Sequence, residues 1–391
     1  MGFEGPLTVG GTVICLITSL LLATVLPTSM QCRSLLLTSL HYAYAVPSLV
    51  ILVTSSSAAI HAFSFVFTYA LLLGVSFIRW PVPRLASLSQ NTLMNLLLSL
   101  MIFAIGLQAS FGNVANFNLN LERVYDFRRN SAAELPWIFG YIYSNISVAV
   151  IPVALSVAVL LRKNMLVMFT ILSSIILFGF THHKSVFFTP LIVLVFCTLF
   201  SKMKSSVNIG WIFILIPIIS LLEIYILKFL FVIETPGLFT SYTVRRSLLV
   251  PPLIDSIYVD FFVNNAKYYW STSKFSLGLI DSPSQLSAPF LIGSTVFGDQ
   301  DMSANAGYLG SGFANAGVFG SASYAVFLGL LISALNSYGR LVGHVLVTSV
   351  SIILIVTVVT STDPTTAILS HGLLALLLIL IITPKSLNRA L

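Results

Sequence analysis

Residues 208–232 read NIGWIFILIPIISLLEIYILKFLFV, and the only charges in this stretch are Glu223 and Lys228. A helix of roughly 20 predominantly apolar residues covers the hydrocarbon core of a bilayer, so the stretch predicts a transmembrane helix. Similar stretches recur along the chain and predict an all-α polytopic membrane protein, with residues 1–391 forming a single integral membrane domain. About eleven spans are expected, at roughly 7–26, 35–53, 58–78, 92–111, 138–161, 165–180, 186–200, 208–232, 307–335, 342–360 and 366–383.

The composition supports the same class. The chain has 391 residues, of which 57% are hydrophobic and 8% are charged. A soluble protein of this length cannot cover its surface with so few charges. The net charge of +7 is explained by membrane topology, and we expect no nucleic-acid partner.

The charges alternate between the segments that join the spans. One set of segments carries ten basic residues and no acid. These ten are Arg33, Arg79, Arg84, Arg162, Lys163, Lys202, Lys204, Arg340, Lys385 and Arg389. The other set, together with span 208–232, holds the remaining nine basic residues and all twelve acids. Since short loops rich in Lys and Arg stay in the cytoplasm, the alternation places the N-terminus outside and the C-terminus inside.

Two of the predicted outside loops are long, at about 112–137 and 233–306. Loops longer than about 15 residues are usually functional or disordered, and the second contains an apolar pattern near helical spacing. That pattern comprises Ile254, Ile257, Tyr258, Phe261 and Phe262. It predicts an amphipathic helix at about 253–264 that lies at the outer membrane interface. Pro251 and Pro252 suit its start, and its polar face would carry Asp255, Asp260 and Asn264.

Cationic side chains are concentrated in three outside segments. The first loop holds Glu122, Arg123, Asp126, Arg128 and Arg129; the second holds Tyr242, Arg245 and Arg246; a turn between two spans holds His182, His183 and Lys184. If these segments converge, they form a pocket suited to phosphate, because the guanidinium fork donates paired hydrogen bonds and keeps its charge. The alternative is that the basic residues anchor the chain at the interface. Adjacent histidines without a third ligand do not predict a metal site.

Several common catalytic motifs are absent. The chain has no GxxxxGK[ST], HExxH or GxSxG pattern, and no cytoplasmic loop is large enough for a nucleotide-binding domain. Chemistry is therefore expected on the outside, where nucleotide sugars are scarce. A substrate in that place would carry its own energy as a lipid-linked diphosphate.

The many spans, two long arginine-bearing outside loops, the His-Lys turn and a Gly/Asn/Phe-rich run resemble the bacterial O-antigen polymerases (Wzy type). Members of that family often show a stretch similar to E-x-Y-x-N-F-G-x-x-G near the last long loop. In the run Phe313-Ala-Asn-Ala-Gly-Val-Phe-Gly320, this chain keeps Asn315, Gly317 and Gly320. It lacks the acid, and Ala316 stands where an aromatic residue is typical.

The resemblance implies a GT-C-like polymerase/ligase architecture in the bacterial inner membrane, with a periplasmic active site. The implied reaction transfers a glycan from undecaprenyl diphosphate onto another undecaprenyl-diphosphate-linked repeat unit, without nucleotide, cofactor or metal. A polysaccharide chain-length regulator is a further expected partner, beside membrane lipids. The expected catalytic residues are Arg245 and Arg246 for the leaving diphosphate, and Asp126, His183 or Glu234 as the base. The expected substrate contacts are Arg123, Arg128, Arg129, Glu122, His182, Lys184, Tyr242, Asn305 and Asn315, with Glu122 a further candidate base.

Three alternatives remain at this point. An O-antigen ligase resembles the polymerase in fold and transfers the glycan to the lipid A core. A lipid-linked oligosaccharide flippase would be expected to carry charges deep in many spans and to show paired repeats, and neither feature is evident in the sequence. A purely structural membrane protein would not need the arginine-rich loops.

Overall fold

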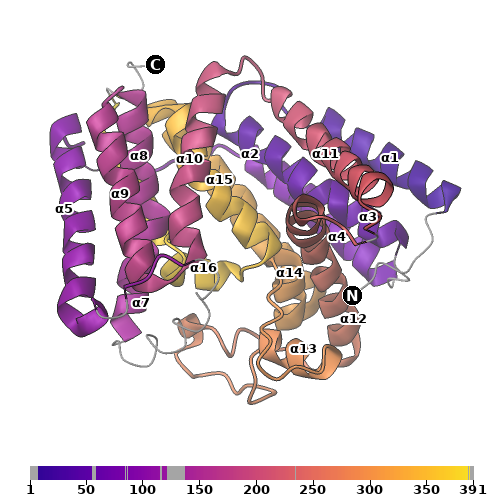
Figure 1. The fold of residues 1–391 in the computed structure, drawn as a ribbon. Coiled ribbons are helices and arrows are strands. Elements are labelled where there is room, and N and C mark those ends of the chain that lie inside the picture. The colour runs from indigo at the N-terminus through magenta and orange to yellow at the C-terminus, as the bar shows by residue number, and fades with distance from the viewer. Residues whose placement is uncertain are drawn as a thin grey trace. The chain divides into compact units, whose positions relative to one another are not determined.

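The computed structural model describes residues 8–54, 59–83, 85, 87–114, 117–120, 137–233, 235–385 and 387. Over these ranges the chain is helical and contains no strand (Figure 1). Nine helices in the described ranges are long and apolar enough to cross a membrane. The protein is therefore an all-helical polytopic membrane protein, as its apolar runs predict.

A helix forms within each of the eleven predicted ranges, but the helices at 7–26 and 342–360 are shorter than the candidate spans and do not count among the nine. Those without a π-helical turn are α1 (Val9–Thr24), α4 (Ala59–Ser76), α9 (Asn164–Thr181), α10 (Lys184–Lys202), α11 (Asn208–Leu230) and α15 (His344–Thr360). Those with one are α2–η1–α3 (Cys32–Leu40, His41–Ala45, Val46–Thr54), α5–η2 (Gln90–Gln108, Ala109–Asn113) and α7–η3–α8 (Trp137–Asn145, Ile146–Val150, Ile151–Leu160). The last span is bent by 58° between α16 (Pro364–Ser370) and α17 (Leu373–Ile382). α9 and α10 are longer than the expected spans 165–180 and 186–200, at 18 and 19 residues.

The predicted helix at 253–264 belongs to a longer helix. A π-helix, η4 (Thr240–Leu249), continues directly into α12 (Val250–Asn264). Together they form 25 residues that are apolar enough to count among the nine candidate spans. The prolines lie at the first turn of α12, as expected, where a missing N–H is tolerated. The helical conformation nevertheless continues upstream of them into η4.

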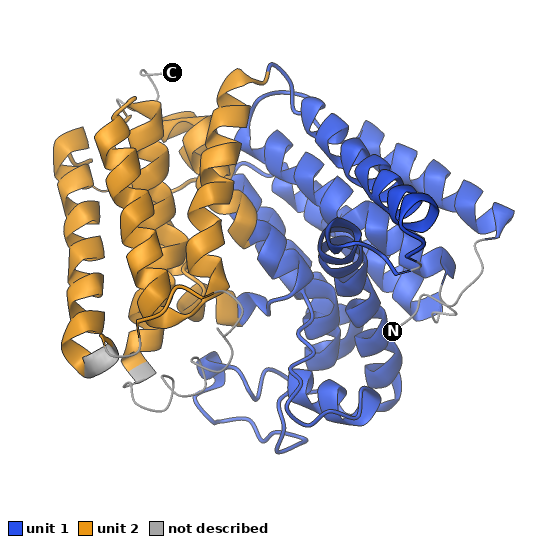
Figure 2. Ribbon diagram, in the orientation of Figure 1, with its two compact units in different colours: residues 1–79, 204–333, 355–365 blue, residues 80–203, 334–354, 366–391 orange. Residues whose placement is uncertain are grey.

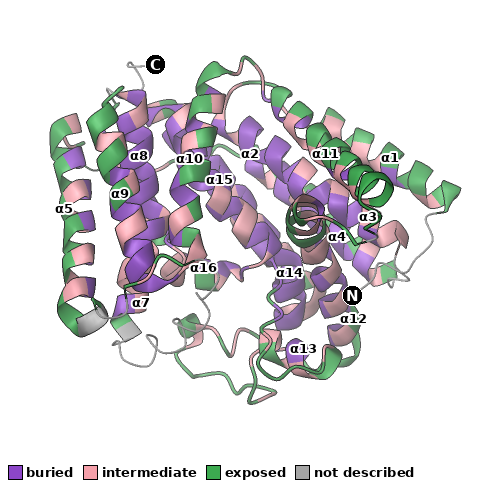
Figure 3. Cartoon of the chain, viewed as in Figure 1, coloured by how far each residue is buried: buried purple, intermediate pink, exposed green. Residues whose placement is uncertain are grey.

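The chain divides into two compact units (Figure 2). Unit 1 comprises 1–79, 204–333 and 355–365, and unit 2 comprises 80–203, 334–354 and 366–391. Within unit 1, α1 packs on α3, α12 packs on α3 and α4, and α11 packs on α2 and η4. Within unit 2, α8 packs against α5, α9 and α10, and it is buried along nearly its whole length (Figure 3).

The predicted span 307–335 is not one straight helix. α14 (Tyr308–Val342) consists of two helices joined at Ala316 (φ −151°, ψ 33°) and Gly317 (φ 62°, ψ −146°). Past this break the chain doubles back, so that the Ser321 hydroxyl donates to the carbonyl of Leu309 at 2.7 Å. The run of small residues explains how the two arms can touch. A Cβ atom on Gly320 would lie 2.0 Å from the carbonyl oxygen of Gly312.

The chain between α12 and α14 is ordered around its own apolar core. This segment contains η5 (Lys274–Ser276) and α13 (Ala288–Val296). Its buried residues pack with those of α12 and α14 in one cluster: Ile254, Tyr258, Val259, Phe262, Tyr268, Ile292, Ala304, Ala306, Phe313 and Ala314. Tyr268 is part of this core, and its hydroxyl donates to the carbonyl of Leu286 at 2.6 Å.

Candidate functional site

The two adjacent arginines of unit 1 lie on the π-helix η4. π-helical geometry is uncommon, usually limited to a single turn and frequent at functional sites, and here it extends over 10 residues. The Ser247 hydroxyl donates to the carbonyl of Tyr242 at 2.7 Å, and the Val250 N–H donates to the carbonyl of Arg245. Because Pro251 and Pro252 have no N–H to offer the preceding turn, the wider helix forms upstream of them.

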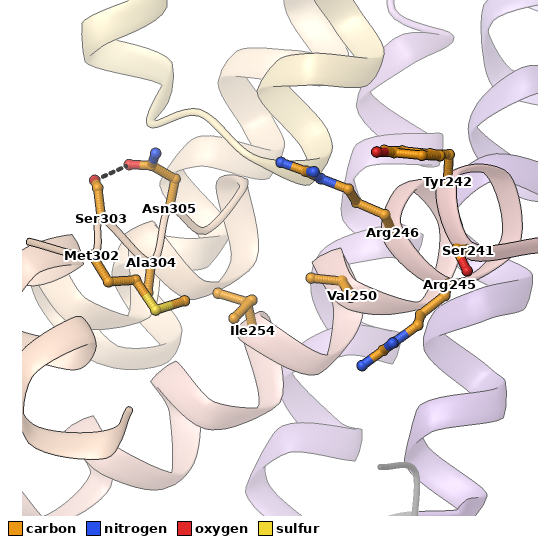
Figure 4. Close-up of a pocket in the computed structure, with 10 residues that line it drawn as sticks. All are labelled: Ser241, Tyr242, Arg245, Arg246, Val250, Ile254, Met302, Ser303, Ala304 and Asn305. Atoms are coloured by element: carbon orange, nitrogen blue, oxygen red, sulfur yellow. Dashed lines mark hydrogen bonds between the residues drawn. The ribbon is translucent and has the colours of Figure 1, made fainter. Parts of the chain in front are cut away.

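The helix bearing Arg245 and Arg246 forms one wall of a cavity of about 570 Å³. The lining residues are Ser241, Tyr242, Arg245, Arg246, Val250, Ile254, Met302, Ser303, Ala304 and Asn305. Figure 4 shows the Arg246 guanidinium extending toward the side where Ser303 and Asn305 lie, while Arg245 leaves the helix in another direction. Four residues expected from sequence to contact substrate thus line one cavity, namely Tyr242, Arg245, Arg246 and Asn305.

The opposite wall, Met302–Asn305, is held by hydrogen bonds from neighbouring segments. The buried Tyr258 hydroxyl donates to the carbonyl of Ala304 at 2.7 Å. The Ala304 N–H donates to the carbonyl of Pro289 at 3.1 Å. The Ser303 hydroxyl donates to the Asn305 Oδ1 at 3.2 Å (Figure 4). This wall is therefore fixed against α12, the same helix that continues from the arginines.

The charged residues described in the lining of this cavity are all positive. Both arginine side chains are exposed, and the ten described residues that line the cavity include no Asp or Glu. The remaining polar groups are the hydroxyls of Ser241, Tyr242 and Ser303 and the amide of Asn305. Two guanidiniums beside neutral donors favour an anion with several oxygen acceptors, and phosphate matches the guanidinium fork.

Asp255 is a residue that sequence reasoning placed wrongly. It was expected on the polar face of its helix, but its side chain is fully buried, whereas Asp260 and Asn264 are exposed. Its Oδ2 accepts a hydrogen bond from the Tyr44 hydroxyl at 2.7 Å. Its Oδ1 accepts from the N–H of Gly310 at 3.0 Å. The carboxylate thus caps the first turn of α14 from another helix, and it follows directly on Ile254, which lines the cavity.

Glu223 holds the other end of the arginine helix. Its carboxylate oxygens accept hydrogen bonds from the N–H groups of Phe239, at 3.0 Å, and Thr240, at 2.6 Å. These are N–H groups in the first turn of a helix, which have no partner within the helix itself. Glu223 does not line the arginine cavity; it lines a separate hollow between α11 and the start of η4.

Asn315 lies at the end of the first arm of α14 and does not line the arginine cavity. Its Oδ1 accepts from the N–H of Trp270 at 2.9 Å, and its amide donates to the carbonyl of Ser311 at 2.9 Å. The side chain thereby joins the break in α14 to the segment after α12. In that segment, partial burial lowers the pKa of the Lys267 ammonium, which donates to the carbonyl of Asn265 at 3.1 Å.

The His-His-Lys turn belongs to unit 2. His182 ends α9 in the left-handed conformation (φ 54°) and is buried. His183 precedes α10, and its Nε2 lies 2.8 Å from the Tyr143 hydroxyl. Lys184 begins α10. No group of three or more metal-ligating side chains occurs among the described residues.

The remaining expected site residues lie outside the described residues. They are Glu122, Arg123, Asp126, Arg128, Arg129 and Glu234. Their assignments as catalytic or substrate-binding groups stay predictions.

Comparison with protein-family models, with curated proteins and with solved structures finds no match to the chain.

Proposed function

We propose that the chain is a membrane glycosyltransferase that polymerises lipid-diphosphate-linked oligosaccharide repeat units into O-antigen or a related surface polysaccharide. The reaction would take place on the periplasmic face of the bacterial inner membrane. One observation supports this above the others: Arg245 and Arg246 line a cavity together with Tyr242 and Asn305, in a chain built of apolar helices.

The proposed reaction explains why two arginines are needed. The bond between the anomeric carbon of the donor glycan and the diphosphate oxygen breaks, and the acceptor hydroxyl oxygen forms a new bond to that carbon. Negative charge grows on the departing undecaprenyl diphosphate as the bond lengthens. Guanidiniums already in position stabilise that charge without reorganising, which is commonly the largest single contribution to catalysis.

The proton of the acceptor hydroxyl must pass to a base. The described residues that line the arginine cavity include no carboxylate or imidazole. Asp126, Glu122, Glu234 and His183 remain the candidates. Of these, only His183 lies among the described residues, where the Tyr143 hydroxyl orients its ring.

The polysaccharide of a strain deleted for this gene tests the proposal. We expect lipopolysaccharide carrying the core plus a single repeat unit, without the ladder of longer chains. Loss of every repeat would favour the ligase or the flippase and contradict polymerisation. An unchanged ladder, with unchanged capsule and exopolysaccharide, would contradict the whole class of function.

Complementation with variants connects the phenotype to the cavity. Arg246→Ala should slow chain growth about 100-fold or more, the usual cost of removing one preorganised donor to a developing anion. Lys228→Ala is the matched control, because Lys228 is an exposed cation of the same unit that does not line the cavity. Both variants should insert at wild-type levels, and a full ladder from Arg246→Ala would remove the proposed diphosphate role.

A further inference from the structure

Unit 1 has a second hollow beside the arginine cavity. It is a groove of about 360 Å³ between α11 and the start of η4. The described residues of its lining are apolar except for one carboxylate, and they are Ile219, Leu222, Glu223, Ile226, Leu227 and Phe239. The carboxylate is already engaged, since it caps the N–H groups of Phe239 and Thr240. The surface left for a ligand is therefore hydrocarbon.

The groove and the arginine cavity share one helix. Phe239 lines the groove, while Ser241 and Tyr242, two and three positions further along, line the cavity. At the helical rise of about 1.5 Å per residue, the two hollows lie within roughly 5 Å of each other along the axis. The apolar groove and the cationic cavity are therefore neighbours along the axis of this helix.

A contact between Glu223 and Gly237 joins α11 to the start of η4 beside the groove. Gly237 allows the Glu223 side chain to reach the start of η4, because a Cβ atom there would lie 2.2 Å from the Glu223 carboxyl carbon. The rest of α11 packs sparsely within its unit: only Ile209, Gly210 and Ser220 are buried along its 23 residues (Figure 3). The outer wall of the groove is therefore open to a chain entering from the lipid.

We infer that this groove binds the isoprenoid chain of the lipid diphosphate whose headgroup occupies the arginine cavity. The inference rests on the proposed function for the identity of the headgroup. Along this helix, the apolar side chain of Phe239 is followed by the guanidiniums of Arg245 and Arg246. A ligand with a hydrocarbon chain at one end and a diphosphate at the other has the same order of chemical groups. An ordinary phospholipid acyl chain is the competing occupant.

Two soluble probes separate the groove from the cavity. Inorganic pyrophosphate carries the headgroup charge alone, and farnesyl diphosphate adds three isoprene units. Binding of both is measured to the full-length protein in nanodiscs. Leu222→Trp fills the groove, and Leu221→Trp is the matched control, because Leu221 is an exposed neighbour on α11 that does not line the groove.

We expect Leu222→Trp to weaken farnesyl diphosphate binding about tenfold, equivalent to losing the burial of roughly two methylene groups. Its affinity for pyrophosphate should stay at the wild-type value, and Leu221→Trp should change neither. Equal farnesyl diphosphate affinities for the two variants would overturn the inference. So would displacement of farnesyl diphosphate by dihexanoyl phosphatidylglycerol at equal concentration, which would assign the groove to ordinary phospholipid.

Failure of the proposed function has a different signature. If Arg246→Ala leaves pyrophosphate binding unchanged, the cavity is not the diphosphate site, whatever the two tryptophan variants do. If Arg246→Ala abolishes pyrophosphate binding while the tryptophan variants are indistinguishable, only the groove assignment fails.

Discussion

Asp255 is a buried carboxylate that joins α12 to two other helices through hydrogen bonds. It belongs to the helix that carries Arg245 and Arg246, and it binds both the Tyr44 hydroxyl and the Gly310 N–H. Only glycine fits at position 310, because a Cβ atom there would lie 2.7 Å from the Asp255 Oδ1. The partners are 211 and 55 positions away in sequence, so no local pattern could have predicted them.

Removal of this side chain should cost more stability than an ordinary truncation. Asp255→Ala leaves a buried hydroxyl and a buried N–H without an acceptor, and we expect a loss of about 2–4 kcal/mol. Asp255→Asn should recover most of it, because the amide oxygen can still accept from Gly310 and the amide N–H can donate to Tyr44. Thermal unfolding of the purified protein measures both, with the exposed Asp260→Ala as the matched control. Equal unfolding temperatures for Asp255→Ala and the control would refute this role.

Gly237 gives a second prediction at the residue scale. Gly237→Ala should displace the Glu223 carboxylate and leave the Phe239 and Thr240 N–H groups uncapped, at a cost of about 1 kcal/mol or more. Hydrogen exchange of those two amides should accelerate, because they lose their acceptor. Gly74→Ala is the control, since a Cβ atom at Gly74 meets nothing within 4 Å. Unchanged exchange at Phe239 and Thr240 in Gly237→Ala would contradict the capping role.

Long apolar runs in the sequence predicted where the helices form. They did not predict where a helix is broken or changes to π-helical geometry. Runs such as 208–232 require internal hydrogen bonding in a bilayer whatever their neighbours are, so α11 forms at Asn208–Leu230. The π-helix η4 and the break in α14 depend on prolines and glycines in their tertiary setting. The helix at 240–264 was expected to be shorter because its polar residues, Arg245 and Arg246 among them, hide its continuity with 253–264.

The residues of the candidate site also differ in how far the sequence could predict them. Arg245 and Arg246 could be singled out because two basic residues in a predicted outside loop oppose the usual charge bias of such loops. Their neighbours Tyr242 and Asn305 line the same cavity. The supporting carboxylates Glu223 and Asp255 could not be assigned, because each acts on backbone groups of a distant segment.

The break in α14 leads to a prediction for that element. Gly317 adopts φ 62° and ψ −146°, a region of backbone conformation that is essentially restricted to glycine. Gly317→Ala should therefore destabilise the protein by about 1–3 kcal/mol, lowering the unfolding temperature. Gly106→Ala, at a helical position with open space around the Cβ, should be neutral. A neutral Gly317→Ala would show that the break is not held in this conformation.

At the scale of the whole molecule, the charge bias and the helix at 240–264 make opposing demands. The eleven spans predicted from the sequence would give an unbroken alternation of charge and would place both ends of 240–264 outside. The same helix is nevertheless long and apolar enough to cross a membrane. The proposed function requires it to remain on the periplasmic side, because the arginines must meet a substrate there.

Cysteine labelling from outside the membrane shows whether the helix at 240–264 crosses the bilayer. Phe231→Cys precedes this helix and Ser282→Cys follows it, and both positions are exposed. The background replaces the native cysteines, which are Cys15, Cys32 and Cys197. We expect a membrane-impermeant maleimide to label both positions in intact spheroplasts, with Lys204→Cys protected until the membrane is opened. Labelling of only one of the two would show that the helix crosses the bilayer.

The proposed polymerase activity can be measured with the purified protein in nanodiscs and a lipid-diphosphate-linked repeat unit as the only substrate. Without nucleotide or any second protein, we predict a ladder of longer glycans and release of one undecaprenyl diphosphate for each bond formed. The Arg245→Ala and Arg246→Ala variants should each lose most of this activity, whereas Lys228→Ala should keep it. A wild-type protein that binds the substrate but extends no chain would contradict the account.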